Sequence, residues 1–91
     1  MSEKKWRVEL SKTALKHLKS IPIKNSQKIL VTLEDLEKSD YPPLHRSVRP
    51  LSGQLRGFFR LRVSDYRIIF ELDFENKKIG VHTIVNRGSA Y

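Results

Sequence analysis

The sequence contains no cysteine, so disulfide bonds and thiolate chemistry are both excluded, and a reducing compartment suits the chain. Its apolar runs are far too short to cross a bilayer, and the charged N-terminal segment lacks the apolar core of a signal peptide. Its glycines fit neither a phosphate-binding loop nor a dinucleotide-binding fingerprint: Gly53, Gly57, Gly80 and Gly88. We therefore expect a cytoplasmic protein with no membrane partner and no nucleotide cofactor.

The histidines are poorly spaced for a metal site. His17, His45 and His82 stand apart in the sequence, with no cysteine or paired carboxylates at ligand spacing, and no Ser/His/Asp arrangement is suggested. We interpret His82, which falls in a predicted strand, as a packed or half-exposed residue rather than as a catalyst. His45 lies in a basic loop, where it either touches phosphate or is solvated. We expect neither a metal ion nor another cofactor.

The chain has few acidic residues: it contains 18 lysines and arginines but only 10 aspartates and glutamates, which gives a formal net charge of +8. This balance favours an anionic partner, although solubility alone also explains a basic surface. The lysines are spread over the surface, whereas the arginines cluster later in the chain: Arg46, Arg49, Arg56, Arg60, Arg62, Arg67 and Arg87. Because a guanidinium group contacts phosphate in a bidentate manner and stacks on bases, this cluster favours a polyanion.

The segment 59–70 is predicted to form a β-hairpin. Apolar residues alternate with arginines over 59–63, and 66–70 is rich in aromatic and β-branched residues, which are both strand signatures. Ser64-Asp65 is the natural two-residue turn between them. The register that follows pairs Phe59 with Phe70, Arg60 with Ile69, Leu61 with Ile68, Arg62 with Arg67, and Val63 with Tyr66.

This register gives the hairpin two chemically different faces. One face is apolar and needs a cover: Phe59, Leu61, Val63, Tyr66, Ile68 and Phe70. The other holds three arginines with an aromatic, an aliphatic and an acidic neighbour: Arg60, Arg62 and Arg67, with Phe58, Ile69 and Glu71. Three guanidinium groups on one open sheet face repel each other, so we interpret this face as a binding site for a polyanion.

The rest of the chain supplies the cover for the apolar face. We predict a strand over 6–10, a helix capped by Ser11 and ended by Pro22, a helix over about 26–38, a proline-punctuated connection over 41–51, and a strand over 78–85. The order β-α-α-β-β-β predicts a single α+β domain over residues 1–91. In it, two helices pack on one face of an antiparallel sheet.

Several of these segments resemble the RelE family of bacterial and archaeal toxins: Leu51-Ser-Gly, Leu55-Arg-Gly57, Arg60-Leu-Arg-Val-Ser-Asp-Tyr-Arg-Ile-Ile-Phe70, Val85-Asn-Arg87 and Tyr91. The resemblance covers nearly the whole chain. It implies the toxin of a type II toxin–antitoxin pair, a ribosome-dependent mRNA endoribonuclease that cuts the codon in the ribosomal A site. It also implies a tightly bound acidic antitoxin, and we expect the toxin alone to be a monomer.

The implied chemistry suits the arginine-rich face. RNA cleaved through its own 2′-hydroxyl needs in-line positioning, cations around the phosphate and groups that move protons, but neither a metal ion nor a protein nucleophile. By the resemblance, four residues align with catalytic or substrate-binding positions: Arg60, Arg67, Arg87 and Tyr91. We expect further RNA contacts from Arg46, Arg49, Arg56, Phe58 and Arg62.

The proton acceptor is not assigned by these residues. Arginine stays charged and accepts protons poorly. Phe58 departs from the pattern of many ribonuclease members, which carry a basic residue there; its ring either stacks a base or packs at the strand start. Tyr91 is a candidate both for stacking on an mRNA base and for moving a proton through its hydroxyl, since nearby arginines favour a phenolate.

Two alternative functions share these features. ParE-like toxins have the same fold and inhibit DNA gyrase as binding proteins, and a plain RNA- or ribosome-binding module would need no catalysis. The clustered arginines and Tyr91 match the ribonuclease branch better than the ParE branch.

Overall fold

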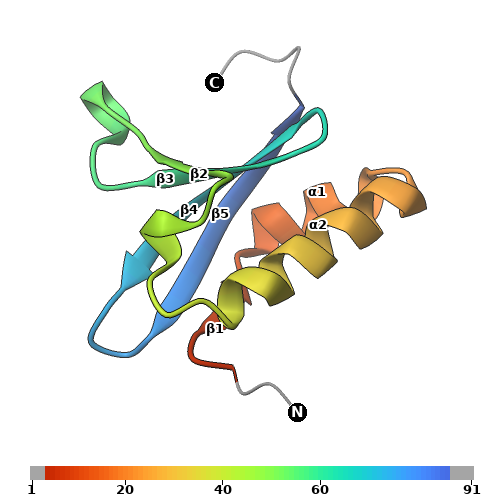
Figure 1. The fold of residues 1–91 in the computed structure, drawn as a ribbon. Coiled ribbons are helices and arrows are strands. Elements are labelled where there is room, and N and C mark those ends of the chain that lie inside the picture. Colours follow the sequence, from red (N-terminus) through yellow and green to blue (C-terminus); the bar gives the residue numbers. More distant parts are fainter. Residues whose placement is uncertain (1–3, 87–91) are drawn as a thin grey trace.

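The computed structural model describes residues 4–86, in which two helices lie against one face of a five-stranded sheet (Figure 1). The elements are β1 (Arg7–Leu10), α1 (Lys12–Ser20), α2 (Ile23–Glu37), β2 (Val48–Pro50), β3 (Phe59–Val63), β4 (Tyr66–Asp73) and β5 (Lys78–Asn86), with short 3-10 turns at Pro42–Leu44 and Gly53–Leu55. The predicted α+β two-layer arrangement is confirmed. No helix in the described range is long and apolar enough to cross a membrane.

The β3–β4 hairpin lies between β5 and β2 in the sheet, whose strand order is β1-β5-β4-β3-β2. All five predicted cross-strand pairs of the hairpin are present, from Phe59 with Phe70 to Val63 with Tyr66. In the turn, Ser64 has a φ of 52°, the left-handed backbone conformation that tight hairpin turns require. The turn and the register were therefore both predicted correctly.

Two features of the sheet differ from the prediction. β1 pairs with β5 in parallel, so the sheet is not wholly antiparallel. Parallel neighbours need a long crossover connection, and here the helices and the hairpin together supply it. In addition, the proline-punctuated connection contributes a strand, because β2 pairs with β3 through Val48 and Leu61. β2 ends at Pro50, which has no N–H to extend the pairing.

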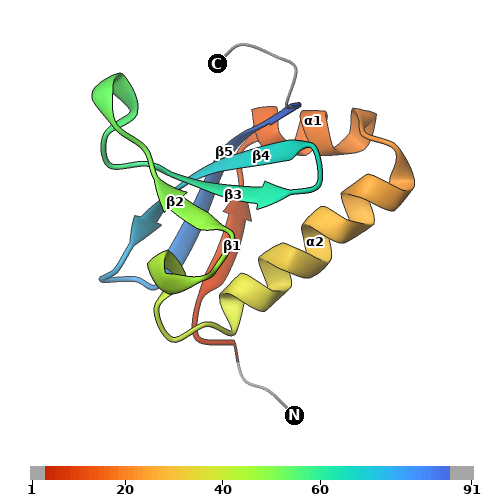
Figure 2. The same cartoon turned by 45° about the horizontal axis from the view of Figure 1, so that its top comes forward.

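The core lies between the helices and the apolar face of the sheet (Figure 2). Leu61, Ile68 and Phe70 are fully buried there, together with Ile29 and Leu36 of α2. Each such side chain contributes about 1.5–3 kcal/mol when removed from water. The helices cover only this face, so the arginine-bearing face of β3 and β4 lies on the other side of the sheet.

Helix α1 begins as predicted, at a serine cap. The Ser11 hydroxyl accepts a hydrogen bond from the Ala14 amide at 2.9 Å and donates one to the His82 carbonyl at 2.7 Å. The predicted start of α2 near Ser26 was wrong, since α2 begins at Ile23. Pro22 precedes it, and the Pro22 carbonyl accepts the first amide bonds of the helix, so the proline both ends one helix and opens the next.

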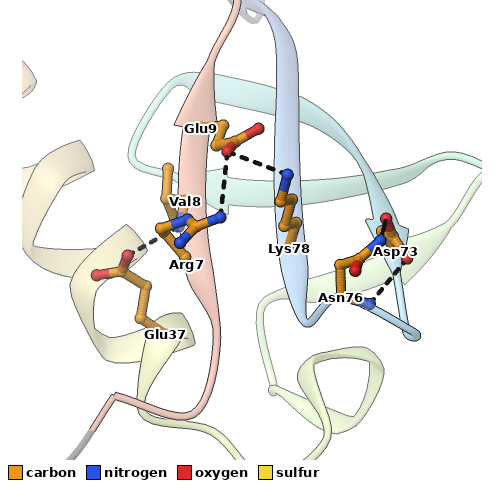
Figure 3. A network of polar contacts seen from close by, with 7 residues as sticks. All are labelled: Arg7, Val8, Glu9, Glu37, Asp73, Asn76 and Lys78. Carbon is orange, nitrogen blue, oxygen red and sulfur yellow. Dashed lines mark hydrogen bonds and ion pairs between the residues drawn. The ribbon is translucent and has the colours of Figure 1, made fainter.

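Glu37, the last residue of α2, ties that helix to β1 (Figure 3). Its Oε2 accepts a hydrogen bond from the Val8 amide at 2.8 Å, and its Oε1 pairs with the Lys4 ammonium at 3.0 Å. Its backbone carbonyl accepts the Lys5 and Trp6 amides at 2.8 and 2.9 Å. Because Glu37 is only 8% exposed, these partners replace the water that its carboxylate loses on folding.

Replacing Glu37 by Ala should lower the free energy of unfolding by about 1–3 kcal/mol, because the Val8 amide loses its acceptor. Urea unfolding measures this change. Lys4→Ala removes only the solvent-facing ion pair and should cost less than about 1 kcal/mol. Glu34→Ala, on the exposed side of the same helix, is the control for helix propensity. Equal losses in Lys4→Ala and Glu37→Ala would assign the effect to the ion pair instead.

Candidate functional site

Four arginines surround a pocket of about 300 Å³ at the β2–β3 edge of the sheet. Among the residues that the structure describes, its lining consists of Arg46, Ser47, Arg49, Arg60 and Arg62, none of which carries a carboxylate. The sheet register explains this gathering, since Arg49 lies opposite Arg60 and Arg62 follows two residues later on the same face. Such a concentration of guanidinium groups is suited to an anion with several oxygens, such as a phosphodiester.

The backbone holds part of this pocket in place. The Arg49 guanidinium donates hydrogen bonds to the carbonyls of Arg46, at 3.2 Å, and Val48, at 2.9 Å. The Arg62 amide donates to the Ser47 carbonyl at 3.0 Å, which extends the strand pairing beyond β2. These bonds fix the loop before β2 against β3, so the arginines from two separated segments face one space.

Arg67, opposite Arg62 in the register, lies deeper than the prediction of an open face implied. Its side chain is half-buried, and its Nη1 is buried with no hydrogen-bond partner in the described part of the chain. Ile69, also assigned to this face, is only 4% exposed, since it lies in register between Arg60 and Thr83, and a long arginine stem can cover apolar surface. The centre of this face is therefore closed to solvent, and the Arg67 Nη1 there has no hydrogen-bond acceptor among the described residues.

His82, Glu71 and Phe58 form a contact group on the same side of the sheet. The His82 Nε2 lies 2.7 Å from Glu71 Oε2, and the His82 ring meets the Phe58 ring edge to face at 5.0 Å. His82 is the extra residue of a β-bulge, because Ile69 pairs with Thr83 and Phe70 with Val81. The side chain of His82 is 48% exposed, as the half-exposed interpretation predicted, but its pairing with Glu71 was missed.

An acidic pocket of about 260 Å³ lies farther along this face, where β4 meets β5 and β1. Its lining consists of Glu9, Glu71, Asp73, Lys78 and Gly80. Glu9 Oε2 lies 3.6 Å from both Arg7 and Lys78 (Figure 3). Hydrogen bonds from the side chain and then the backbone amide of Asn76 hold the pKa of Asp73 below its ordinary value. The face thus has a basic part near β2 and an acidic part near β1.

The predicted site residues fall into three groups. Arg46, Arg49, Arg60 and Arg62 come together around one pocket, and Arg67 is the register neighbour of Arg62. Arg56 is exposed in the loop before β3 and does not line that pocket, and Phe58 packs against His82. Arg87 and Tyr91 lie outside the described residues. Within residues 4–86, no three His, Cys, Asp or Glu side chains are grouped to hold a metal ion.

A family profile described as "ParE toxin of type II toxin-antitoxin system, parDE" matches residues 8–91. With the two-helix, five-stranded fold, this match defines a toxin of a type II toxin–antitoxin system. The chain belongs to this ParE toxin family, within the RelE/ParE superfamily.

Individual relatives carry RelE names. A curated protein of Methanocaldococcus jannaschii, named as a candidate RelE1 toxin, is 28% identical over 87 residues, which are 96% of each chain. A chain of the RelE–RelB complex from Pyrococcus horikoshii OT3 is 29% identical, with a TM-score of 0.76 over 94% of this chain and 99% of that one. A chain of the RelBE2 toxin–antitoxin complex from Mycobacterium tuberculosis shares the fold, at 24% identity and a TM-score of 0.80 over 94% and 95%.

Arg67→Met tests whether the buried guanidinium group serves the fold. Methionine keeps an apolar stem and removes the donor without a partner, so the melting temperature should be unchanged or raised by up to about 5 °C. Arg62→Met, at the exposed register partner, is the matched control and should leave the melting temperature unchanged. A clear fall for Arg67→Met alone, measured by circular dichroism, would assign Arg67 to the fold.

Proposed function

We propose that this toxin is a ribosome-dependent mRNA endoribonuclease that cuts the codon in the A site. The observation that carries the proposal is the pocket lined by four arginines, of which Arg62 lies opposite Arg67 in the sheet. RNA presents a phosphate at every nucleotide, and guanidinium groups bind its oxygens strongly.

In the proposed reaction, the RNA supplies its own nucleophile. The 2′-oxygen attacks the adjacent phosphorus, the bond to the 5′-oxygen breaks, and the products are a 2′,3′-cyclic phosphate and a 5′-hydroxyl. Negative charge grows on the phosphate oxygens in the transition state, where Arg60, Arg62 and Arg67 stabilise it. By their resemblance to RelE positions, we propose Arg87 and Tyr91 as further catalytic or substrate-binding residues.

Gyrase inhibition is the second candidate function, because the profile that matches residues 8–91 is that of the ParE toxin. Such a toxin acts by binding, without cutting nucleic acid. The arginine pocket favours RNA cleavage, since a pocket of this composition fits a phosphate better than an ordinary protein surface.

Arg62→Ala should reduce cleavage of mRNA on programmed ribosomes by about 10²–10³-fold, because one contact to the developing charge is lost. Arg7→Ala removes the same charge at the opposite edge of the sheet and should cut at the parental rate. Primer extension locates the cut, and a supercoiling assay with purified gyrase runs in parallel. Gyrase inhibition by a chain that leaves mRNA intact would replace the ribonuclease proposal with the ParE-like one.

We further propose an acidic antitoxin as the partner, since the chain carries a formal net charge of +8. The similar structures from Pyrococcus horikoshii OT3 and Mycobacterium tuberculosis are those of toxin–antitoxin complexes. Attraction between opposite charges accelerates encounter and is screened by salt. The association rate constant should therefore fall roughly tenfold or more between low and high salt in stopped-flow measurements, with a smaller change in dissociation. A rate constant independent of salt would contradict a charge-guided interface.

A further inference from the structure

Attack by a 2′-hydroxyl requires a proton acceptor, and guanidinium groups cannot serve because they remain charged. Two of the histidines are occupied elsewhere. His17 Nδ1 lies 3.4 Å from the Ile84 amide, and His45 Nδ1 accepts the Ser47 amide at 3.1 Å while its Nε2 pairs with Asp35. His82 differs from both, because it lies on the arginine-bearing side of the sheet, next to Phe58.

The contact with Glu71 determines which ring nitrogen of His82 is available to accept a proton. Glu71 Oε2 lies 2.7 Å from His82 Nε2, a distance suited to a hydrogen bond in which Nε2–H donates to the carboxylate. The neutral ring then carries its lone pair on Nδ1, for which the described residues contain no hydrogen-bond partner. A carboxylate that orients an imidazole and stabilises its protonated form is the arrangement by which histidines act as general bases.

The position of His82 relative to the arginine pocket fits this role. Phe58 packs on the His82 ring and precedes Arg60 by two residues, and Glu71 follows Ile69, the register partner of Arg60, by two residues. Two residues along a strand span about 7 Å. Arg60 and His82 lie in β3 and β5, with β4 between them, so their backbones are about 10 Å apart across the sheet. An RNA segment that contacts both side chains would place a phosphate at Arg60 and a ribose 2′-hydroxyl at His82.

The charges on either side of His82 favour one orientation of the RNA. The arginine pocket lies toward β2, and the carboxylates of Glu9, Glu71 and Asp73 lie toward β1. The acidic side repels a phosphate, so the scissile phosphate settles among the arginines. His82 stands at the boundary between the two parts.

We propose that His82 is a catalytic residue, the general base of the RNA cleavage, and that Glu71 is its positioning residue; this inference rests on the proposed ribonuclease function. The proton of the 2′-hydroxyl passes to Nδ1 as the 2′-oxygen bonds to phosphorus. The bond from phosphorus to the 5′-oxygen breaks, and this oxygen takes a proton from water. The imidazolium then releases its proton to solvent.

The test is single-turnover cleavage of a defined mRNA on programmed ribosomes by the full chain. His82→Ala should slow cleavage by about 10²–10⁴-fold, with ribosome binding and melting temperature at the parental values. Free imidazole at millimolar concentration should restore part of the lost rate. Glu71→Gln should slow cleavage about 10–100-fold, as expected for a residue that orients a catalytic group.

Two comparisons separate catalysis from a structural contribution. Glu75→Gln removes a carboxylate from the exposed turn between β4 and β5, outside both the arginine pocket and the acidic pocket, and it should cleave at the parental rate. The double variant His82→Ala with Glu71→Gln should be no slower than His82→Ala, because Glu71 acts through His82. If the rate losses of the two single variants multiply in the double variant, Glu71 acts independently of His82 and is not its positioning residue.

The outcomes distinguish this inference from the proposed function. A chain that cuts at the parental rate without His82, or a slow His82→Ala variant that imidazole does not rescue, overturns the assignment of His82 alone. A parent chain that binds ribosomes without cutting mRNA overturns both proposals. Should His82→Ala fail to fold, His82→Gln keeps a polar side chain at the bulge without a comparable base, and parental cleavage by that variant is equally decisive.

Discussion

The two-residue turn at Ser64-Asp65 controls which side of the sheet each side chain of β3 and β4 occupies. Side chains alternate along a strand, so a slip of one residue would send Arg60, Arg62 and Arg67 toward the helices and expose the core residues opposite them. The left-handed conformation of Ser64 closes the turn in the observed register. The core and the candidate site are thus two consequences of a single register.

A comparison of energies explains why this register holds in spite of its clustered charges. Two guanidinium groups about 7 Å apart in water repel by about 0.6 kcal/mol, and salt reduces this further. Leu61, Ile68 and Phe70, all fully buried on the other face, contribute about 1.5–3 kcal/mol each. Burial on one face therefore outweighs repulsion on the other, and the arginines need not stabilise the fold that displays them.

How well the sequence predicts each part depends on how local its interactions are. The hairpin was predicted pair by pair, because its turn and alternation lie within 59–70. The parallel pairing of β1 with β5 and the short strand β2 depend on segments far apart in sequence, and neither was predicted.

The candidate site follows the same rule. Arg60, Arg62 and Arg67 were predicted to share one face of the hairpin, but the meeting of Arg46 and Arg49 with Arg60 and Arg62 requires β2 to pair with β3. The contact between His82 and Glu71 depends on a bulge in β5, which interrupts the alternation on which a sequence-based register relies.

The carboxylate of Glu37 has a consequence for association between copies of the chain. β1 is an edge strand, and an unpaired edge amide invites another strand to add to the sheet. Glu37 occupies the outward-facing Val8 amide, so α2 blocks this edge with a side chain. At the opposite edge, β2 is three residues long and ends in a proline. Both edges therefore resist the addition of a further strand and so the extension of the sheet into an aggregate.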